Sequence, residues 1–189
     1  MNVYDFDGTI YDGDCTLDFY FYCMRKYPRI LCYVPYQLCG AMLYKFRKIS
    51  KTRFKEIFFV FLKMIPDIDM DVKEFWDMHE RKIYKWYLRE HKDDDVIISA
   101  SPSWLIEEIS KRCRIKSVIA SEVDSETGRY NGVNCYGEEK VRRFYEAFPD
   151  GEIEKFYSDS DSDRPLAKIA KESFWVAKGE VYLWKIERN

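Results

Sequence analysis

Two aspartates stand two residues apart near the start of the chain, in the segment Asn2-Val3-Tyr4-Asp5-Phe6-Asp7-Gly8-Thr9-Ile10. The residues before Asp5 predict a short strand, and side chains two apart on a strand point to the same face. Gly8 allows a sharp turn after this strand, and Thr9 places a hydroxyl just beyond it. The segment therefore predicts a strand that ends in two convergent carboxylates, although an acidic turn after an edge strand is the simpler alternative.

The pattern after residue 91 alternates between strands and helices. Short apolar runs predict strands at 96–98, 117–120, 156–157, 174–176 and 181–183. Between them, helices are predicted from Ser101, from Gly137 and over 164–169, and turn signals in 122–134 predict a small hairpin. This order predicts an α/β fold with a doubly wound parallel sheet and helices on both faces.

The segment between the first two strands has a different composition, because it is aromatic and basic with almost no glycine. Prolines interrupt it, and its apolar periodicity predicts helices at 15–26, 36–47, 51–63 and 71–90. We expect 1–14 and 92–189 to form the α/β core, and 15–91 to form an inserted α-helical cap. Such a cap would cover the carboxyl edge of the sheet, where ligands bind in folds of this kind.

Composition narrows the possible partners and surroundings. The 189 residues carry a net charge of −2 and no recognised nucleic-acid-binding motif, so nucleic acid is not expected as a partner. The six cysteines show no metal-site spacing, and we expect them to be reduced and buried. No export signal precedes Asp5, which predicts a cytoplasmic protein, and no feature indicates an obligate protein partner. The apolar run 30–44 is shorter than the ~20 residues of a membrane span and is expected to be a core or cap helix.

Four motifs then follow one another in order along the chain. After Asp5 and Asp7, Ser99 ends the strand over 96–98 and Lys140 begins a helix after Gly137-Glu138-Glu139; the fourth motif holds Asp159 and Asp163. This set, which extends from Asn2 to about Trp184, resembles the haloacid dehalogenase-like hydrolase superfamily. The segment 97–102 and the inserted cap resemble the subgroup that contains phosphoserine phosphatase.

The resemblance implies a phosphatase that works through an aspartyl-phosphate. Asp5 is then the nucleophile, and Asp7 is the acid that protonates the leaving alkoxide and later the base that activates water. A halide leaves without a proton, so the presence of Asp7 favours cleavage of a phosphate ester over dehalogenation. Ser99 would hydrogen-bond a phosphoryl oxygen, and Lys140 would neutralise charge that develops on phosphorus and on Asp5.

The resemblance also implies a Mg²⁺ cofactor. Asp5, the backbone carbonyl of Asp7 and Asp159 would hold the cation, which prefers oxygen ligands. Asp163 would complete the metal site from just outside, where it orients Lys140 or a metal-bound water. Each of these residues alone is more often structural; their order and strand context together indicate a site.

The substrate is expected to be a small phosphorylated molecule, which the motifs do not specify further. By resemblance, Asp14 stands near the place of a residue that grips a substrate amine, where a glutamate would be expected. Arg53 is the candidate cap residue for a substrate carboxylate, and Ser101 is placed with the substrate-binding residues. A phosphotransferase with the same intermediate and a catalytically silent binding module are the alternatives.

A basic run in the cap has two interpretations. Its cations lie beside aromatic residues, which is compatible with a solvated helix–turn–helix surface. The alternative is that the run attracts an anionic substrate, such as a phospholipid headgroup at a membrane surface, which would make the protein a lipid phosphate phosphatase. The run consists of Lys45, Arg47, Lys48, Lys51, Arg53 and Lys55, with Tyr44, Phe46 and Phe54 as its neighbours.

Overall fold

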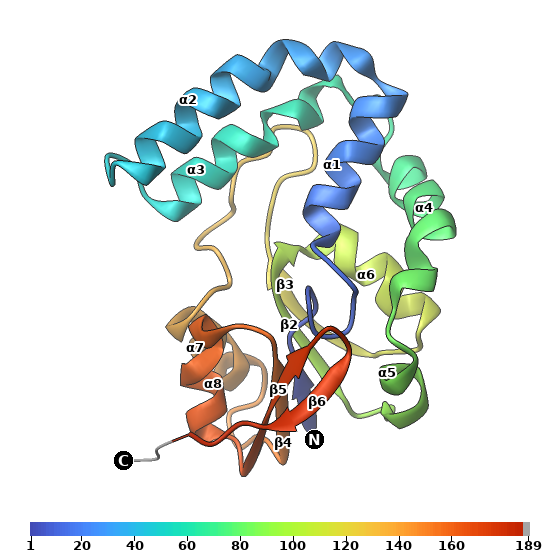
Figure 1. Cartoon of the computed structure of the whole chain (residues 1–189), viewed down its shortest axis with the longest axis vertical. Coiled ribbons are helices and arrows are strands. Elements are labelled where there is room, and N and C mark those ends of the chain that lie inside the picture. Colours follow the sequence, from blue (N-terminus) through green and yellow to red (C-terminus); the bar gives the residue numbers. More distant parts are fainter. Residues whose placement is uncertain (187–189) are drawn as a thin grey trace.

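A six-stranded sheet runs through the centre of the computed structural model, which describes residues 1–186 (Figure 1). The strand order is β3-β2-β1-β4-β5-β6, and all neighbouring strands are parallel except β5 and β6. The doubly wound parallel sheet predicted from the sequence is thus confirmed, with one antiparallel strand at its edge. The strands are β1 (Asn2–Tyr4), β2 (Val96–Pro102), β3 (Ser117–Ser121), β4 (Lys155–Ser158), β5 (Glu172–Ala177) and β6 (Glu180–Leu183).

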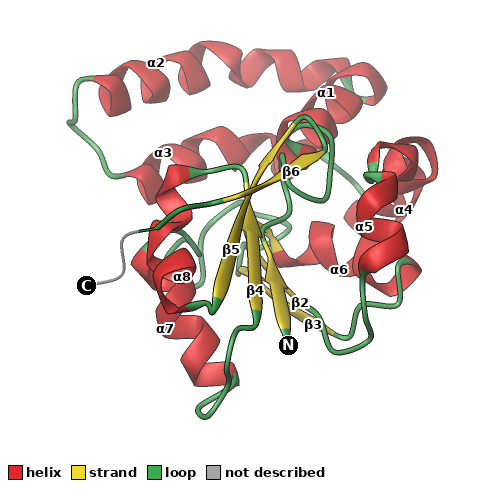
Figure 2. Ribbon diagram, turned by 60° about the horizontal axis from the view of Figure 1, so that its bottom comes forward, coloured by secondary structure: helices red, strands yellow, loops and turns green. Residues whose placement is uncertain are grey.

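The two faces of the sheet bury alternate residues of the same strands. Val3 and Phe156 belong to one buried cluster, together with side chains of two of the helices after β3. Their neighbours Tyr4, Ile97 and Tyr157 belong to the opposite cluster. Helices therefore cover both faces, as Figure 2 shows. The core helices are α6 (Ser103–Arg112), α7 (Glu138–Ala147) and α8 (Arg164–Ile169).

Five helices fill the segment between β1 and β2, and their bounds correct part of the prediction. The predicted helix over 71–90 is wrong, because the chain is interrupted between two shorter helices. Ile83 pairs with Tyr11 in an isolated bridge, and the amide of Tyr84 donates to the carbonyl of Ile10 at 2.9 Å. The helices are α1 (Cys15–Lys26), α2 (Val34–Lys45), α3 (Lys51–Phe58), α4 (Ile68–His79) and α5 (Lys85–Glu90), with 3₁₀ turns at Pro28–Tyr33, Phe59–Met64, Glu80–Lys82 and Asp161–Asp163.

These five helices occupy two different places (Figure 1). α1, α2 and α3 lie beyond the carboxyl edge of the sheet, where a cap was expected. α4 and α5 lie beside α6 against the sheet. The ring of Tyr87 in α5 packs edge-on against the ring of Tyr4 in β1, with 5.1 Å between the ring centroids. The indole of Trp76 donates to the carbonyl of Leu105 in α6 at 2.8 Å. The division of the chain at residues 15 and 91 stays a prediction.

One further expectation is confirmed in reduced form, and another is corrected. Residues 122–134 contain a minimal hairpin without regular strands, in which Val123 and Tyr130 form one antiparallel bridge and the amide of Asp124 donates to the carbonyl of Arg129 at 2.8 Å. The Asp124 carboxylate accepts bonds from Thr127 in its turn. The six cysteines are free, but Cys32 and Cys39 are exposed rather than buried, since both lie in the outer part of the cap. Within residues 1–186, no helix has both the length and the apolar character to span a bilayer.

Candidate active site

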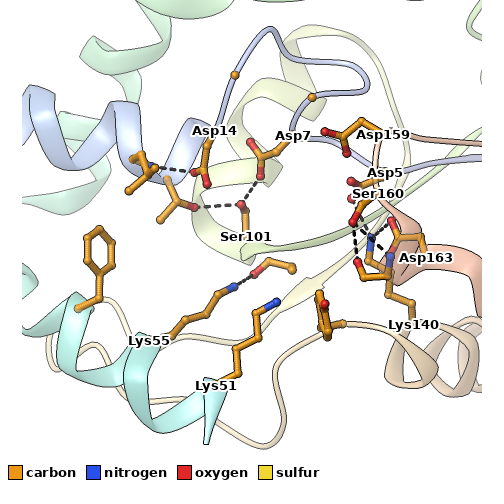
Figure 3. A pocket seen from close by; sticks show the side chains of 18 of the residues that line it. Asp5, Asp7, Asp14, Lys51, Lys55, Ser101, Lys140, Asp159, Ser160 and Asp163 are labelled. Atoms are coloured by element: carbon orange, nitrogen blue, oxygen red, sulfur yellow. Dashed lines mark hydrogen bonds and ion pairs between the residues drawn. The ribbon is translucent and has the colours of Figure 1, made fainter. Parts of the chain in front are cut away.

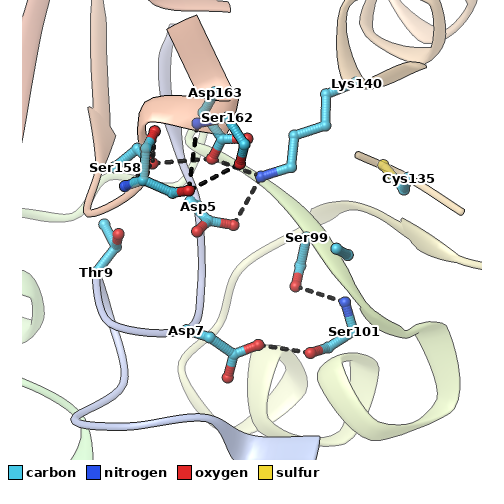
Figure 4. A network of polar contacts seen from close by, with 12 residues as sticks. Asp5, Asp7, Thr9, Ser99, Ser101, Cys135, Lys140, Ser158, Ser162 and Asp163 are labelled. Carbon is cyan, nitrogen blue, oxygen red and sulfur yellow. Dashed lines mark hydrogen bonds and ion pairs between the residues drawn. The ribbon is translucent and has the colours of Figure 1, made fainter. Parts of the chain in front are cut away.

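A lysine buried between two carboxylates lies at the carboxyl edge of the sheet (Figure 4). Lys140, in the first turn of α7, places Nζ 2.8 Å from Oδ1 of Asp5 and 2.7 Å from Oδ2 of Asp163. Ser158 at the end of β4 donates to the same Asp163 oxygen at 2.8 Å. Lys140 is 2% exposed and Asp163 is 1% exposed. Ion pairs this deeply buried persist only when each charge is well partnered, so the three side chains hold one another in place.

Burial and the neighbouring charges shift the pKa values of Asp5 and Lys140 in opposite directions. Burial raises the pKa of Asp5 to about 7, and the positive charge of Lys140 opposes the rise. Burial also disfavours the charged form of Lys140, but the carboxylates of Asp5 and Asp163 outweigh it and raise the lysine pKa above its usual value. Lys140 is therefore a permanent cation in contact with the carboxylate that follows β1.

The second aspartate of the pair occupies a separate environment. Asp7 accepts a 2.5 Å bond from the hydroxyl of Ser101 and a 2.7 Å bond from the backbone amide of Cys15. Burial raises the pKa of Asp7 to about 6, and the charge of Asp14 adds to the rise. A carboxyl group with this pKa can both donate and accept a proton near neutral pH.

A tight turn sets Asp7 apart from Asp5. The amides of Ile10 and Tyr11 both donate to the carbonyl of Phe6, at 2.8 and 3.0 Å. Gly8 has a φ of +71°, and a Cβ at this position would lie 1.9 Å from Oδ2 of Asp159. Glycine is therefore required both by the backbone conformation and by the close approach of a carboxylate.

The acidic residues around this turn suit a magnesium ion. The carboxylate of Asp159 lies against Gly8, and burial raises the pKa of this carboxyl group. The backbone amide of Asp159 donates to the hydroxyl of Thr9 at 3.0 Å. In residues 1–186 no three His, Cys, Asp or Glu side chains are grouped as metal ligands. Mg²⁺ commonly takes only one or two carboxylates and fills its remaining positions with other oxygens. Asp5, Asp159 and the carbonyl of Asp7 fit this requirement.

Asp163 fits a place just outside such a metal site. Its Oδ2 is occupied by Lys140 and Ser158, whereas its Oδ1 is buried without a hydrogen-bond partner. A buried oxygen of this kind is costly unless something binds it, and a water held by a neighbouring cation would satisfy it.

A cavity of about 730 Å³ opens in front of these residues, and its two walls differ (Figure 3). The wall from the α/β core carries carboxylates, whereas the wall from α3 carries lysines and phenylalanines. The α3 residues are spaced at three and four, so they share one face of the helix. The carboxylates belong to Asp5, Asp7, Asp14, Asp159 and Asp163, and the α3 side chains to Lys51, Phe54, Lys55 and Phe58.

Lys55 belongs to the basic run of the cap and lines the pocket, although Arg53 was the residue of that run predicted to bind substrate. Its Nζ donates to the carbonyl of Ala100 at 2.8 Å and to Oδ1 of Asn134 at 3.0 Å. Burial, together with the charge of Lys51, lowers its pKa to about 8. The helical spacing of the α3 face is the signal that could have identified it.

The structure places the predicted substrate-binding residues differently relative to the pocket. Arg53 does not line the pocket, because it lies on another side of α3, pairs with Glu56 at 2.9 Å and is 56% exposed. Asp14 lines the pocket, and its carboxylate also caps α1 by accepting from the amide of Leu17. Ser101 lines the pocket as the partner of Asp7, and Ser99 is buried behind it and accepts from the Ser101 amide at 3.1 Å. The predicted contact of Ser99 with a phosphoryl group stays a prediction.

The family assignment agrees with this geometry. The family model of the haloacid dehalogenase-like hydrolases matches residues 3–168. The chain therefore belongs to the haloacid dehalogenase-like hydrolase family, as its four motifs predict. No curated protein gives a significant match to the chain.

Solved structures with a similar fold come from several bacteria. A protein of unknown function from Bordetella pertussis Tohama I has a TM-score of 0.70 at 17% identity, with 92% of this chain and 87% of that chain covered. A phosphoserine phosphohydrolase-like protein from Francisella tularensis has a TM-score of 0.56 at 16% identity, with 92% and 86% covered. A family hydrolase from Salmonella enterica has a TM-score of 0.55 at 11% identity, with 89% and 59% covered. These likenesses support the fold.

Proposed function

We propose that the protein is a Mg²⁺-dependent phosphatase that hydrolyses a small phosphate monoester through an aspartyl-phosphate on Asp5. The observation that carries this proposal is the different environment of two aspartates only two residues apart. Asp5 contacts a buried cation, Lys140, at 2.8 Å, whereas Asp7 is bonded to the neutral hydroxyl of Ser101. Different environments suit two carboxyl groups to different roles, one as nucleophile and the other as acid and base.

In the first step, a carboxylate oxygen of Asp5 attacks phosphorus and the bond from phosphorus to the ester oxygen breaks. Asp7 gives its proton to that oxygen, so the product leaves as an alcohol. In the second step, Asp7 takes a proton from water, the water oxygen attacks phosphorus, and Asp5 is released as the carboxylate with inorganic phosphate. Lys140 stabilises the negative charge during both steps.

The bound Mg²⁺ would supply positive charge that keeps Asp5 ionised and offsets the charge of the phosphoryl oxygens. Its ligands would be Asp5, Asp159 and the carbonyl of Asp7. The contribution of Asp163 is to hold Lys140, to which it is bonded at 2.7 Å.

The α3 wall supports a substrate with a second anionic group. Lys51 and Lys55 project into the cavity opposite the carboxylates (Figure 3). Phe54 and Phe58, between and beside the lysines on the same helix face, add an apolar surface to this wall. An ester whose organic part carries both an apolar segment and a carboxylate or phosphate complements these side chains.

Hydrolysis of a panel of phosphate monoesters, with and without Mg²⁺, tests the proposal. The panel contains p-nitrophenyl phosphate, phosphoserine, sugar phosphates and a lysophospholipid phosphate. Asp5→Asn should abolish a Mg²⁺-dependent turnover that the wild type shows. Asp12→Asn is the matched control, because Asp12 is exposed and bonded to Tyr84 but does not line the pocket. Full activity of the Asp5 variant would refute the assigned nucleophile.

A further inference from the structure

Helix α2 exposes large apolar side chains to solvent, whereas the side chain that it buries against the protein is polar. Gln37 is buried, accepts a 2.6 Å bond from the hydroxyl of Tyr20 and donates a 2.7 Å bond to the carbonyl of Phe58. Gly40 allows close packing on α3, because a Cβ there would lie 2.5 Å from Cγ2 of Ile57. Gln37 and Gly40 are the buried residues of the helix. A helix at the surface of a globular domain normally shows the opposite arrangement.

Helix α2 lies on the outer side of the cap (Figure 1). Exposed apolar side chains along this helix and at its two ends form a patch. Leu38 is 61% exposed, Met42 is 60% exposed and Phe46 is 65% exposed. Scattered single exposed apolar residues are ordinary, but several of them on one helix mark a surface that another partner covers. The α2 patch comprises Leu31, Tyr36, Leu38, Met42, Leu43 and Phe46.

The charge around the α2 patch is positive at both ends. No Asp or Glu occurs between Asp18 and Glu56, and this interval contains nine Lys and Arg residues. At the C-terminal end of α2 and just beyond it, the side chains of Lys45, Arg47 and Lys48 are exposed, and none forms an ion pair with residues 1–186. At the other end, Arg25 and Arg29 are likewise exposed. The partner should therefore be apolar inside and negatively charged at its surface.

We propose that the α2 patch and its flanking cations dock the protein on the surface of an anionic lipid bilayer. The helix would lie in the interface, with Leu38 and Met42 among the acyl chains and Lys45 and Lys48 at the headgroups. A second copy of the same surface suits the patch less well, because it would bring two positively charged rims together. Docking is independent of the proposed hydrolysis, since it needs none of the side chains assigned to the reaction.

Flotation of the whole chain with lipid vesicles tests the proposal. Vesicles of phosphatidylcholine alone are compared with vesicles that contain about 30% phosphatidylglycerol. The protein should float with the anionic vesicles, remain unbound with the neutral ones, and dissociate as salt is raised. Absence of binding to anionic vesicles at low salt would overturn the proposal.

Surface variants with matched controls distinguish binding through the α2 patch from nonspecific adsorption to vesicles. Leu38→Ser with Met42→Ser should lower the partition coefficient by about tenfold or more, because two large side chains lose burial. Met78→Ser on α4, where the methionine is 48% exposed, should leave binding unchanged. The substituted positions are exposed, so an unchanged thermal transition and unchanged hydrolysis should accompany the loss.

The cations are tested in the same way. Lys45→Gln with Lys48→Gln should weaken binding to anionic vesicles, by roughly fivefold for each charge removed. Lys85→Gln with Lys168→Gln removes two exposed lysines elsewhere and should have little effect. Equal binding of all variants would contradict the proposal. So would a dimer in sedimentation that the Leu38 and Met42 changes dissociate, in the absence of vesicle binding, because a second copy would then cover the patch.

Discussion

The two walls of the cavity are built in different ways. The core wall consists of side chains fixed by short bonds to buried groups, such as Lys140 between Asp5 and Asp163. The cap wall is one face of α3, whose Lys55 reaches the core through bonds to Ala100 and Asn134. The groups proposed to react are therefore held by the core and by bonds to one another. The groups proposed to select the substrate depend on where a cap helix packs.

Among substitutions in the core wall, removal of the buried cation Lys140 should have the largest effect on activity and stability. In Lys140→Met, the loss of one preorganised charge should lower kcat by about 10²–10³-fold. The variant also leaves Asp5 and Asp163 without their partner, so unfolding should be easier by about 3–5 kcal/mol. Steady-state kinetics and urea unfolding measure the two effects, and full activity in a destabilised protein would contradict the role of Lys140.

Asp7→Asn should separate substrates by their leaving groups. Release of the alcohol from an alkyl phosphate should fall by about 10²–10⁴-fold, because the alkoxide no longer receives a proton. A p-nitrophenolate ion leaves without protonation, so its rapid release in the first turnover should persist. Stopped-flow and rapid-quench measurements compare the two esters. An equal loss for both would argue against Asp7 as the acid.

Gly8→Ala tests the contact between the core wall and the proposed cation. The new Cβ would collide with Asp159, which would have to move away from the turn. The Mg²⁺ concentration for half-maximal activity should then rise about 10–100-fold. Gly132→Ala is the control for positive φ, because Gly132 has a φ of +102° and no atom within 4 Å of an added Cβ. Unchanged Mg²⁺ dependence in Gly8→Ala would exclude Asp159 as a ligand.

Substitutions in the cap wall should have smaller effects than those in the core wall, and they should act on substrate binding. Because the pKa of Lys55 is lowered to about 8, its side chain is charged below that pH and becomes neutral above it. KM for a substrate with a second anionic group should therefore rise as pH passes 8, and Lys55→Met should raise KM about tenfold at pH 7 and remove this dependence. Arg53→Met, on another side of α3, should change KM less than twofold, within the range of ordinary surface substitutions. Equal effects of the two variants would contradict the assignment of Lys55.

The sequence predicted the core wall well because its information is local. The strand before Asp5, the glycine turn and the position of Lys140 at the start of a helix all follow from neighbouring residues. The parallel sheet and the presence of helices on both faces follow in turn from the alternation of elements.

The cap was predicted less well because tertiary contacts decide its details. The break at Ile83 depends on its bridge to Tyr11, which lies 72 positions earlier in the chain. The choice of Lys55 over Arg53 depends on which face of α3 packs against Gly40. The apolar run that includes α2 was expected to be a core or cap helix, yet many of its large side chains are exposed. Sequence alone does not show whether such a run is buried.

Capture of a phosphorylated Asp5 tests the central claim most directly. The wild-type protein is mixed with p-nitrophenyl phosphate and Mg²⁺, quenched in acid within one turnover, digested and analysed by mass spectrometry. An added phosphoryl group on Asp5, absent without Mg²⁺ and absent in Asp5→Asn, is the expected result. Steady hydrolysis with the phosphoryl group on another residue, or activity of Asp5→Asn equal to that of the wild type, would contradict the proposed mechanism.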